Sequence, residues 1–164
     1  MKKRILTAVL AAALVTGTCA ATVSAKEEKA YTIGICQLVQ HDALDAATKG
    51  FEDAITEKMG DSVKFDEQNA QGDSNTCSTI INSFVSEGAD LILANATASL
   101  QAAAAGTSDI PILGTAVTEY GVALGIDDFD GTVGGNISGT SDLAPLDEQA
   151  DICLLYTSPS PRDA

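Results

Sequence analysis

One stretch, residues 90–105, constrains the fold of this chain more than any other. The run Leu91-Ile92-Leu93 is short, continuous and apolar, which is typical of a strand buried on both faces. Small polar residues follow it, and an alanine-rich segment of high helix propensity comes next, with Thr97 or Ser99 placed to cap it. This order places free backbone N–H groups and hydroxyls at the carboxyl edge of a parallel sheet, where open α/β sheets bind small ligands.

The segments around this stretch alternate in the same way. Strands are predicted at residues 31–39, 62–66 and 110–113, with a fifth at 122–126. Helices are predicted from an N-cap at Asp42 to Gly60, from Asp73 or Ser74 to Gly88, and after the third strand as far as Gly106. A polar loop is predicted at 139–142 and the start of a further helix at 145–152. Because strands and helices alternate at this spacing, we predict an α/β fold with a parallel, doubly wound sheet flanked by helices.

Residues 1–25 have the pattern of a secretory signal peptide. A basic start is followed by an apolar run over residues 5–15 that is too short to span a membrane. Small residues at 23–25 predict cleavage after Ala25. Cys19 leaves a second interpretation open, in which an acylated cysteine anchors a lipoprotein. In both cases we expect the mature protein to be exported, to the periplasm, the cell surface or the medium.

The C-terminal residues differ in composition from the acidic segment before them. Residues 153–163, CLLYTSPSPRD, resemble the translated read-through of a transposon-end sequencing adapter. We therefore expect residues 26–152 to form the genuine domain and residues 153–164 to be a non-native tail. On this interpretation the natural gene continues past Ile152, and the chain is an N-terminal fragment.

Composition limits the classes of partner. The formal net charge is −14, which argues against nucleic acid and anionic membrane surfaces as partners. Aromatic residues make up only 4%, so the core must be aliphatic. Cys36 and Cys77 fall on apolar positions and are interpreted as buried thiols. A disulfide between them stays open as the alternative in an exported protein.

The sequence offers little for catalysis, metals or cofactors. His41 is the only histidine, and no nucleophile motif accompanies it, so we predict a binding protein without a catalytic residue. Residues 127–131 suggest calcium, but in the EF-hand register Ile126 and Ile137 take ligand positions, so no metal site is predicted. Glycines near residue 134 match neither the dinucleotide fingerprint nor a P-loop, and no cofactor is predicted.

Small polar clusters follow the predicted strands, and in a parallel sheet the first three meet at one edge. The predicted ligand-binding residues are Gln40, His41, Asp42, Asn95, Ala96, Thr97, Thr115, Ala116, Thr140, Ser141 and Asp142. Hydroxyls and backbone N–H groups suit a carboxylate, and Asp142 suits an ammonium group. That pairing describes a free amino acid. The alternative is that each cluster is ordinary turn and cap chemistry.

The chain from Tyr31 to Asp142 resembles the first lobe of the substrate-binding proteins of ABC importers, in the branch with tryptophan and aromatic amino-acid binders. The resemblance is carried by Ile33-Gly-Ile-Cys-Gln-Leu, His41-Asp-Ala-Leu-Asp45, Ala94-Asn-Ala-Thr-Ala, Asp109-Ile-Pro-Ile-Leu-Gly-Thr-Ala-Val-Thr118 and Gly135-Asn-Ile-Ser-Gly-Thr-Ser-Asp142. It implies a type I periplasmic-binding-protein fold that clamps a small solute between two lobes and delivers it to a membrane permease. On this resemblance, we expect the second lobe and most of the hinge to be missing from this chain.

Two other functions remain open from the sequence. A ligand-sensing domain of a receptor would have the same fold, with a membrane span or DNA-binding segment elsewhere in the gene. An α/β enzyme would need a nucleophile or an acid–base pair, and neither is evident. The ligand, the partner permease and the form of anchoring are not determined by the residues.

Overall fold

The computed structural model describes residues 30–157, and it contains one five-stranded sheet with the order β2-β1-β3-β4-β5. The strands are β1 (Tyr31–Gln37), β2 (Val63–Asn69), β3 (Leu91–Asn95), β4 (Ile112–Val117) and β5 (Ile137–Ser141). The helices are α1 (Asp42–Met59), η1 (Gly60–Ser62, a 3-10 turn), α2 (Ser74–Glu87), α3 (Thr97–Gly106), α4 (Tyr120–Leu124) and α5 (Leu146–Thr157). Every strand pair is parallel, so the predicted α/β fold class is confirmed. The predicted signal peptide, its cleavage site and Cys19 lie outside the described residues.

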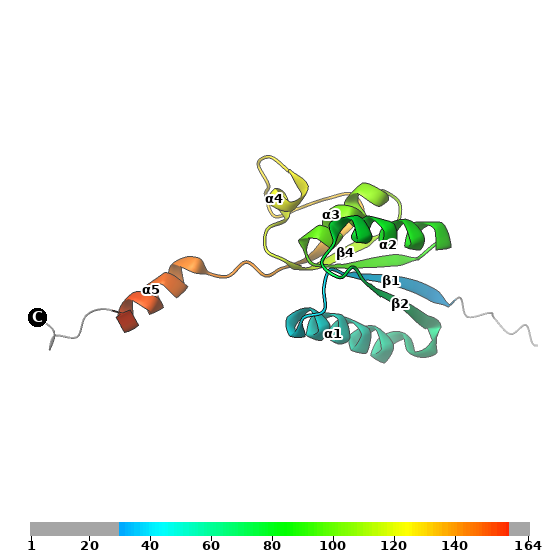
Figure 1. Ribbon diagram of the computed structural model, residues 1–164, viewed down its shortest axis with the longest axis horizontal. Coiled ribbons are helices and arrows are strands. Elements are labelled where there is room, and N and C mark those ends of the chain that lie inside the picture. The colour runs from blue at the N-terminus through cyan, green and yellow to red at the C-terminus, as the bar shows by residue number, and fades with distance from the viewer. Residues whose placement is uncertain (1–29, 158–164) are drawn as a thin grey trace, which may run out of the picture.

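The helices cover both faces of the sheet, as Figure 1 shows: α1 lies on one side, and α2, α3 and α4 lie on the other. This is what right-handed crossovers require, because the chain moves from β1 to β2 in one direction and then returns past β1 to β3. The core accordingly has two parts. A large aliphatic cluster with Phe84 packs under α2 and α3, and a smaller one around Ile33, Ile35 and Leu93 packs under α1.

Helix α1 has the predicted extent but a different cap. The N-cap is His41 and not Asp42, because the His41 Nδ1 atom accepts a hydrogen bond from the Ala43 N–H at 3.2 Å. Asp42 is instead the first helical residue, where its charge favours the positive end of the helix dipole. Gly60, with φ 55°, ends the helix as predicted.

The cap prediction for α2 is confirmed, and the one for α3 is wrong. Asp73 accepts the Asn75 N–H at 2.9 Å at the start of α2. At the start of α3 the N-cap is Ala96, which has no side-chain oxygen to cap the helix, and Thr97 is already helical. Ser99 is fully buried, and its hydroxyl lies beside two thiols instead of capping the helix.

The last two strand predictions need correction. Residues 122–126 are not a strand: both Glu119 carboxylate oxygens accept backbone N–H groups, at 2.8 and 2.6 Å, and so start helix α4. A short apolar run fits a helix as well as a strand, so its pattern could not decide. The fifth strand is β5, where the sequence predicts a polar loop. Its residues lack an apolar signal because β5 is largely exposed.

Strand β4 is also longer than predicted, running to Val117 and not stopping at residue 113. Thr115 and Ala116 therefore lie inside the strand and not in a turn after it. Helix α5 begins as predicted, continues through residue 157, and stands apart from the sheet in Figure 1. The predicted boundary at residue 152 falls within this helix, and the division of the chain at that point stays a prediction.

Cys36 on β1 and Cys77 on α2 are both buried and free, so the prediction of buried thiols is confirmed. Each sulfur lies 3.6 Å from the Ser99 hydroxyl oxygen, which joins β1, α2 and α3 in one small polar contact within the core. Burial is the main cause that raises the pKa of Cys36 to about 12. At neutral pH this thiol stays protonated and is a poor nucleophile.

We expect Cys36 and Cys77 to resist alkylation by iodoacetamide in the folded chain and to react fully after unfolding in guanidinium. Burial blocks access, and the raised pKa of Cys36 removes its thiolate. Exposed Cys153 in the same sample is the control and labels without denaturant. Mass spectrometry of the separated peptides measures each site. Equal labelling of Cys36 and Cys153 in the folded chain contradicts the expectation, as does a disulfide-linked Cys36–Cys77 peptide.

Candidate functional site

A row of polar side chains crosses the carboxyl edge of the sheet on the face that α1 covers. Gln37 pairs in register with Asn95, and Asn95 with Thr115, on the neighbouring strands β1, β3 and β4. Thr140 on β5 completes the row, because its hydroxyl donates to the Thr115 hydroxyl at 3.4 Å. The row is buried at Gln37 and Asn95 and open at Thr140.

The buried half of the row is a connected hydrogen-bond network. The Gln37 amide donates to the Asp45 carboxylate at 2.6 Å and to the Val39 carbonyl at 3.1 Å. Its oxygen accepts from the Thr48 hydroxyl at 2.7 Å. Both donors and the oxygen of the Gln37 side chain are therefore bonded. These bonds fix the first turns of α1, and the loop between β1 and α1, against the end of β1.

Asn95 ties the same helix to β3. Its amide group donates to the Leu44 carbonyl and to the Thr48 hydroxyl, both at 2.9 Å, and more weakly to Gln37 at 3.4 Å. Its side-chain oxygen is buried and has no hydrogen-bond partner among the described residues. Asn95 is thus held rigidly by its nitrogen beneath the edge of the sheet, and its side chain acts first as a support.

The open half of the row joins the start of α3 to β4, and β4 to β5. The Ala96 N–H donates to the Thr115 carbonyl at 2.9 Å, and the Asp142 N–H donates to the Val117 carbonyl at 3.1 Å. The Ser141 hydroxyl donates to the Thr118 carbonyl at 2.7 Å, so this predicted site hydroxyl is already engaged within the protein. These contacts bring the predicted residues of β3, β4 and β5 together.

Three further predicted residues lie on the loop after β1 and at the start of α1. Gln40, His41 and Asp42 are all exposed, and the His41 ring is occupied in capping α1. The Leu38 N–H donates to the Asn95 carbonyl at 3.2 Å, which places the start of this loop beside β3. The loop therefore adjoins the same edge, but among residues 30–157 the side chains of Gln40, His41 and Asp42 form no hydrogen bond with those of Thr115 or Thr140.

Two of the predicted residues have unusual backbone. Ala96 has φ 93° and Ala116 has φ 53°, values that L-residues other than glycine rarely adopt. Ala116 lies where the β4–β5 register is interrupted, between Gly114 and Val117. Such strained positions are concentrated at binding and active sites, because the surrounding structure must hold them in place. Both strained residues border the polar row.

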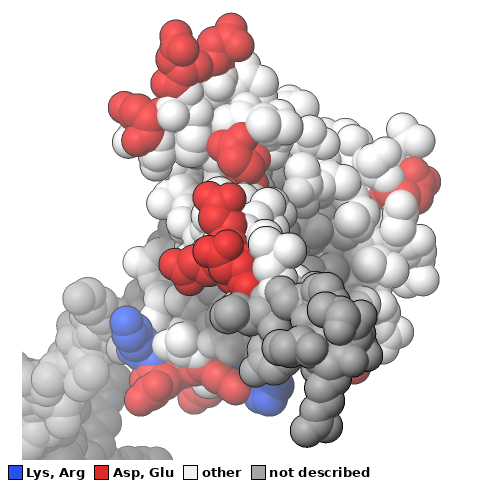
Figure 2. Space-filling model, turned by 90° about the vertical axis from the view of Figure 1, so that its left-hand side faces the viewer, with Lys and Arg blue, Asp and Glu red and all other residues white. Residues whose placement is uncertain are grey.

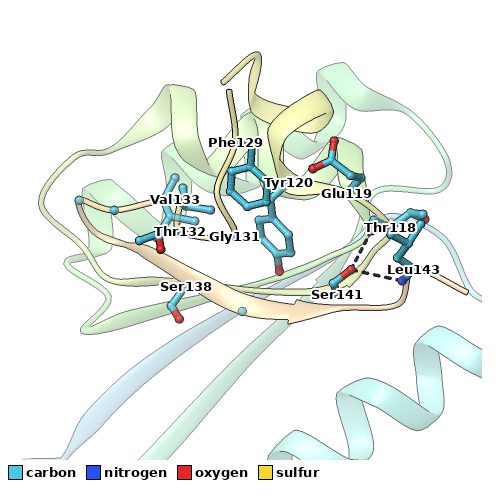
Figure 3. Close-up of a pocket in the computed structure, with 14 residues that line it drawn as sticks. Thr118, Glu119, Tyr120, Phe129, Gly131, Thr132, Val133, Ser138, Ser141 and Leu143 are labelled. Carbon is cyan, nitrogen blue, oxygen red and sulfur yellow. Dashed lines mark hydrogen bonds between the residues drawn. The ribbon is translucent and has the colours of Figure 1, made fainter. Parts of the chain in front are cut away.

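Hollows lie on both faces of the β4–β5 pair. The larger, about 540 Å³, lies between α4, β5 and residues 129–135, with Phe129, Tyr120 and Val133 among its walls (Figure 3). It contains only Ser141 of the predicted site residues. The smaller, about 280 Å³, lies beside α1 and includes both Thr115 and Thr140. The chemistry of the polar row therefore adjoins the smaller hollow, and we take that edge as the candidate site.

The electrostatic environment is acidic. Figure 2 shows Asp and Glu side chains spread over the face it views, with few Lys or Arg between them. Such a field attracts cationic groups and repels polyanions such as nucleic acid. Between residues 30 and 157 no group of His, Cys, Asp and Glu is arranged to hold a metal ion. Within that same part of the chain, the helices are too short or too polar to cross a bilayer.

Sequence analysis missed the residues that support this edge. Ile33, Ile35 and Gln37 alternate along β1 and point to the face that α1 covers. A polar residue at such a buried position is a usable signal of a hydrogen-bond network. Thr48 beside the apolar stripe of α1 carries the same signal. Tyr120 lies against Gly114 and Gly139, and no sequence pattern signals this contact, because it depends on the register of β4 and β5.

Comparison with known proteins decides the family. The profile described as ABC transporter substrate binding protein matches residues 32–160. The chain belongs to this family. The resemblance drawn from the sequence motifs is therefore confirmed. A curated relative, a tyrosine-binding protein of Clostridioides difficile (strain R20291), is 45% identical over 133 residues, which are 79% of this chain and 38% of the relative.

Solved structures of substrate-binding proteins share this fold. The ligand-free, open structure of a substrate-binding protein with adhesive properties from Clostridium difficile is 42% identical, with a TM-score of 0.70, and the match covers 79% of this chain and 44% of that one. An ABC domain from Streptococcus pneumoniae in complex with L-Trp is 32% identical, with a TM-score of 0.69, covering 76% and 42%. The chain thus spans less than half the length of these relatives.

We expect Gln37→Leu to lower the free energy of unfolding by about 1–3 kcal/mol, because half-buried Asp45 and buried Thr48 and Asn95 lose their common partner. Urea denaturation followed by circular dichroism measures the loss. The control is Gln40→Leu, the same change at an exposed position, which should cost at most about 0.5 kcal/mol. Equal stability of the two variants contradicts a supporting role for the Gln37 network.

Proposed function

We propose that residues 26–152 form the first lobe of an exported solute-binding protein, which captures an amino acid between two lobes and delivers it to an ABC permease. The proposal includes no catalytic step. It is supported by family membership and by two relatives, one a tyrosine-binding protein and the other an ABC domain in complex with L-Trp. Aromatic amino acids are therefore the first ligands to test.

The observation that carries the proposal is the uncapped start of α3 beside the polar row. No side chain caps this helix, because its N-cap is Ala96. Its first N–H groups thus lack the side-chain partner that a Ser or Asp would supply, and a helix start of this kind favours a carboxylate. Ala96 donates its own N–H to the Thr115 carbonyl at 2.9 Å, so the helix start and the Thr115–Thr140 hydroxyl pair belong to one edge.

The ammonium group of an amino acid needs a hydrogen-bond acceptor. Asp142 directly follows β5, is exposed, and is held by its N–H bond to the Val117 carbonyl. A carboxylate there suits an ammonium group, and the acidic field around the edge works in the same direction. The proposed contacts of this lobe are therefore a helix start and hydroxyls for the carboxylate, and Asp142 for the ammonium group.

The test uses the protein that carries both proposed lobes, titrated calorimetrically with a panel of amino acids that includes L-tyrosine and L-tryptophan. We expect one or more to bind, and Thr115→Val to weaken that binding about tenfold or more, because a hydrogen bond to a charged group is lost. The control is Thr79→Val on the exposed side of α2, which should leave affinity unchanged. No heat with any amino acid contradicts the proposal.

The 164-residue chain alone gives a second result. A clamp needs two faces, and one open edge buries too little of a small ligand to hold it tightly. We therefore expect the chain alone to bind the same amino acid weakly or not at all. Micromolar affinity in this chain contradicts the two-lobe mechanism, even if the amino-acid class is right.

A further inference from the structure

Strand β5 raises a question about how the candidate edge is held in position. It is the outermost strand and pairs with β4 alone. Four of its five residues are exposed, so apolar burial contributes little to its place in the sheet. Yet Thr140, Ser141 and the following Asp142 make up the β5 share of the proposed site. Some other contact must fix β5 for these groups to stay in register with Thr115.

The contact is the ring of Tyr120. Gly114 of β4 and Gly139 of β5 are register partners, and a Cβ on either would overlap the Tyr120 hydroxyl. The two glycines thus form a seat for the phenol on the face of the sheet opposite to α1. Figure 3 shows the Tyr120 ring directed from α4 down onto β5. The side chain is only 5% exposed, so the ring fills this seat closely.

The phenol also bonds to β5 directly. Its hydroxyl donates to the Thr140 carbonyl at 3.2 Å. Burial raises the pKa of Tyr120, with the negative charge of Asp142 as the next cause, so this carboxylate lies close enough to act on the phenol. Tyr120 is the first residue of α4, and the Glu119 side chain caps this helix by accepting two of its backbone N–H groups. The cap therefore fixes the backbone that carries the tyrosine. One side chain therefore links α4 with the neighbouring strands β4 and β5.

We propose that Tyr120 is a positioning residue of the binding edge, which sets β5 so that Thr140 and Asp142 stand beside Thr115. The inference rests on the proposed function, since it assigns Tyr120 a role in that same site. Tyr120 does not touch the ligand in this account; it acts through β5. The hydroxyl and the ring make separate contributions, the first through Thr140 and the second through the glycine seat.

The first experiment measures amide hydrogen exchange in this chain and needs no ligand. Gly114→Ala places a methyl group in the seat, and we expect exchange at residues 137–141 to rise about tenfold or more while exchange in β1 and β3 is unchanged. Tyr120→Leu added to Gly114→Ala removes the overlap and should slow β5 exchange relative to Gly114→Ala alone. Additive effects of the two changes, or unchanged exchange in β5 with Gly114→Ala, overturn the proposal.

The second experiment measures affinity in the two-lobed protein, with L-tyrosine and L-tryptophan as probes. Tyr120→Phe keeps the ring and removes only the hydroxyl, and we expect it to weaken binding about fivefold to tenfold. Ile81→Val lowers stability in the α2 core without touching β5 and should leave affinity unchanged. An equal loss of affinity in both variants overturns the positioning role.

The two experiments separate this inference from the proposed function. If the unmutated two-lobed protein binds no amino acid, the proposed function fails, and hydrogen exchange still decides whether Tyr120 sets the position of β5. If the protein binds and Tyr120→Phe binds equally well, the proposed function stands and the positioning role is overturned. A fall in affinity together with faster β5 exchange supports both.

Discussion

The structure depends on a buried amide network at the carboxyl ends of β1 and β3. Gln37 and Asn95 lie side by side in register, and both reach α1 through Thr48. Each of these polar groups is costly to bury without a partner, so the network is stable only when the strands and the helix hold one relative position. An apolar contact at the same place would allow α1 to slide along β1 and β3, because it has no directional bonds. The network instead fixes where α1 begins and where the loops after β1 and β3 emerge.

The candidate edge uses this rigidity to present backbone groups. Small residues line it, and two of them, Ala96 and Ala116, have left-handed backbone that costs free energy to maintain. The α3 start lacks a side-chain cap, so its N–H groups are available to a ligand in a way that a serine cap would prevent. The strained backbone and the missing cap make the edge locally less stable. The Gln37–Asn95 network and the contact of Tyr120 with β5 hold the edge in place.

The burial of the strands is uneven across the sheet. The central strands β1 and β3 are buried on both faces, as is typical of parallel sheets. At β4 and β5 both faces carry hollows, of about 540 and 280 Å³, and most of β5 is exposed. The relatives of this chain are more than twice as long as the matched region.

The sequence alone determined the repeated local patterns. Alternating strands and helices, the buried run Leu91-Ile92-Leu93, and the caps Asp73 and Gly60 follow from hydrophobic period and backbone preference, which act over a few residues. The family could be named because its motifs lie along the chain in order. The same local signals misplaced residues 122–126 and overlooked β5, since a short apolar run has no period and an exposed edge strand has no apolar face.

Only the tertiary structure decided which distant residues meet. Gln37 pairs with Asn95 and Thr115 contacts Thr140 across 58 and 25 residues of chain. The Tyr120 ring lies against Gly114 and Gly139, two register partners on neighbouring strands. No local preference encodes them, because each depends on sheet register and on the space that a missing side chain leaves. The sequence shows which residue types follow each strand. Only the fold shows that they lie together at one candidate site.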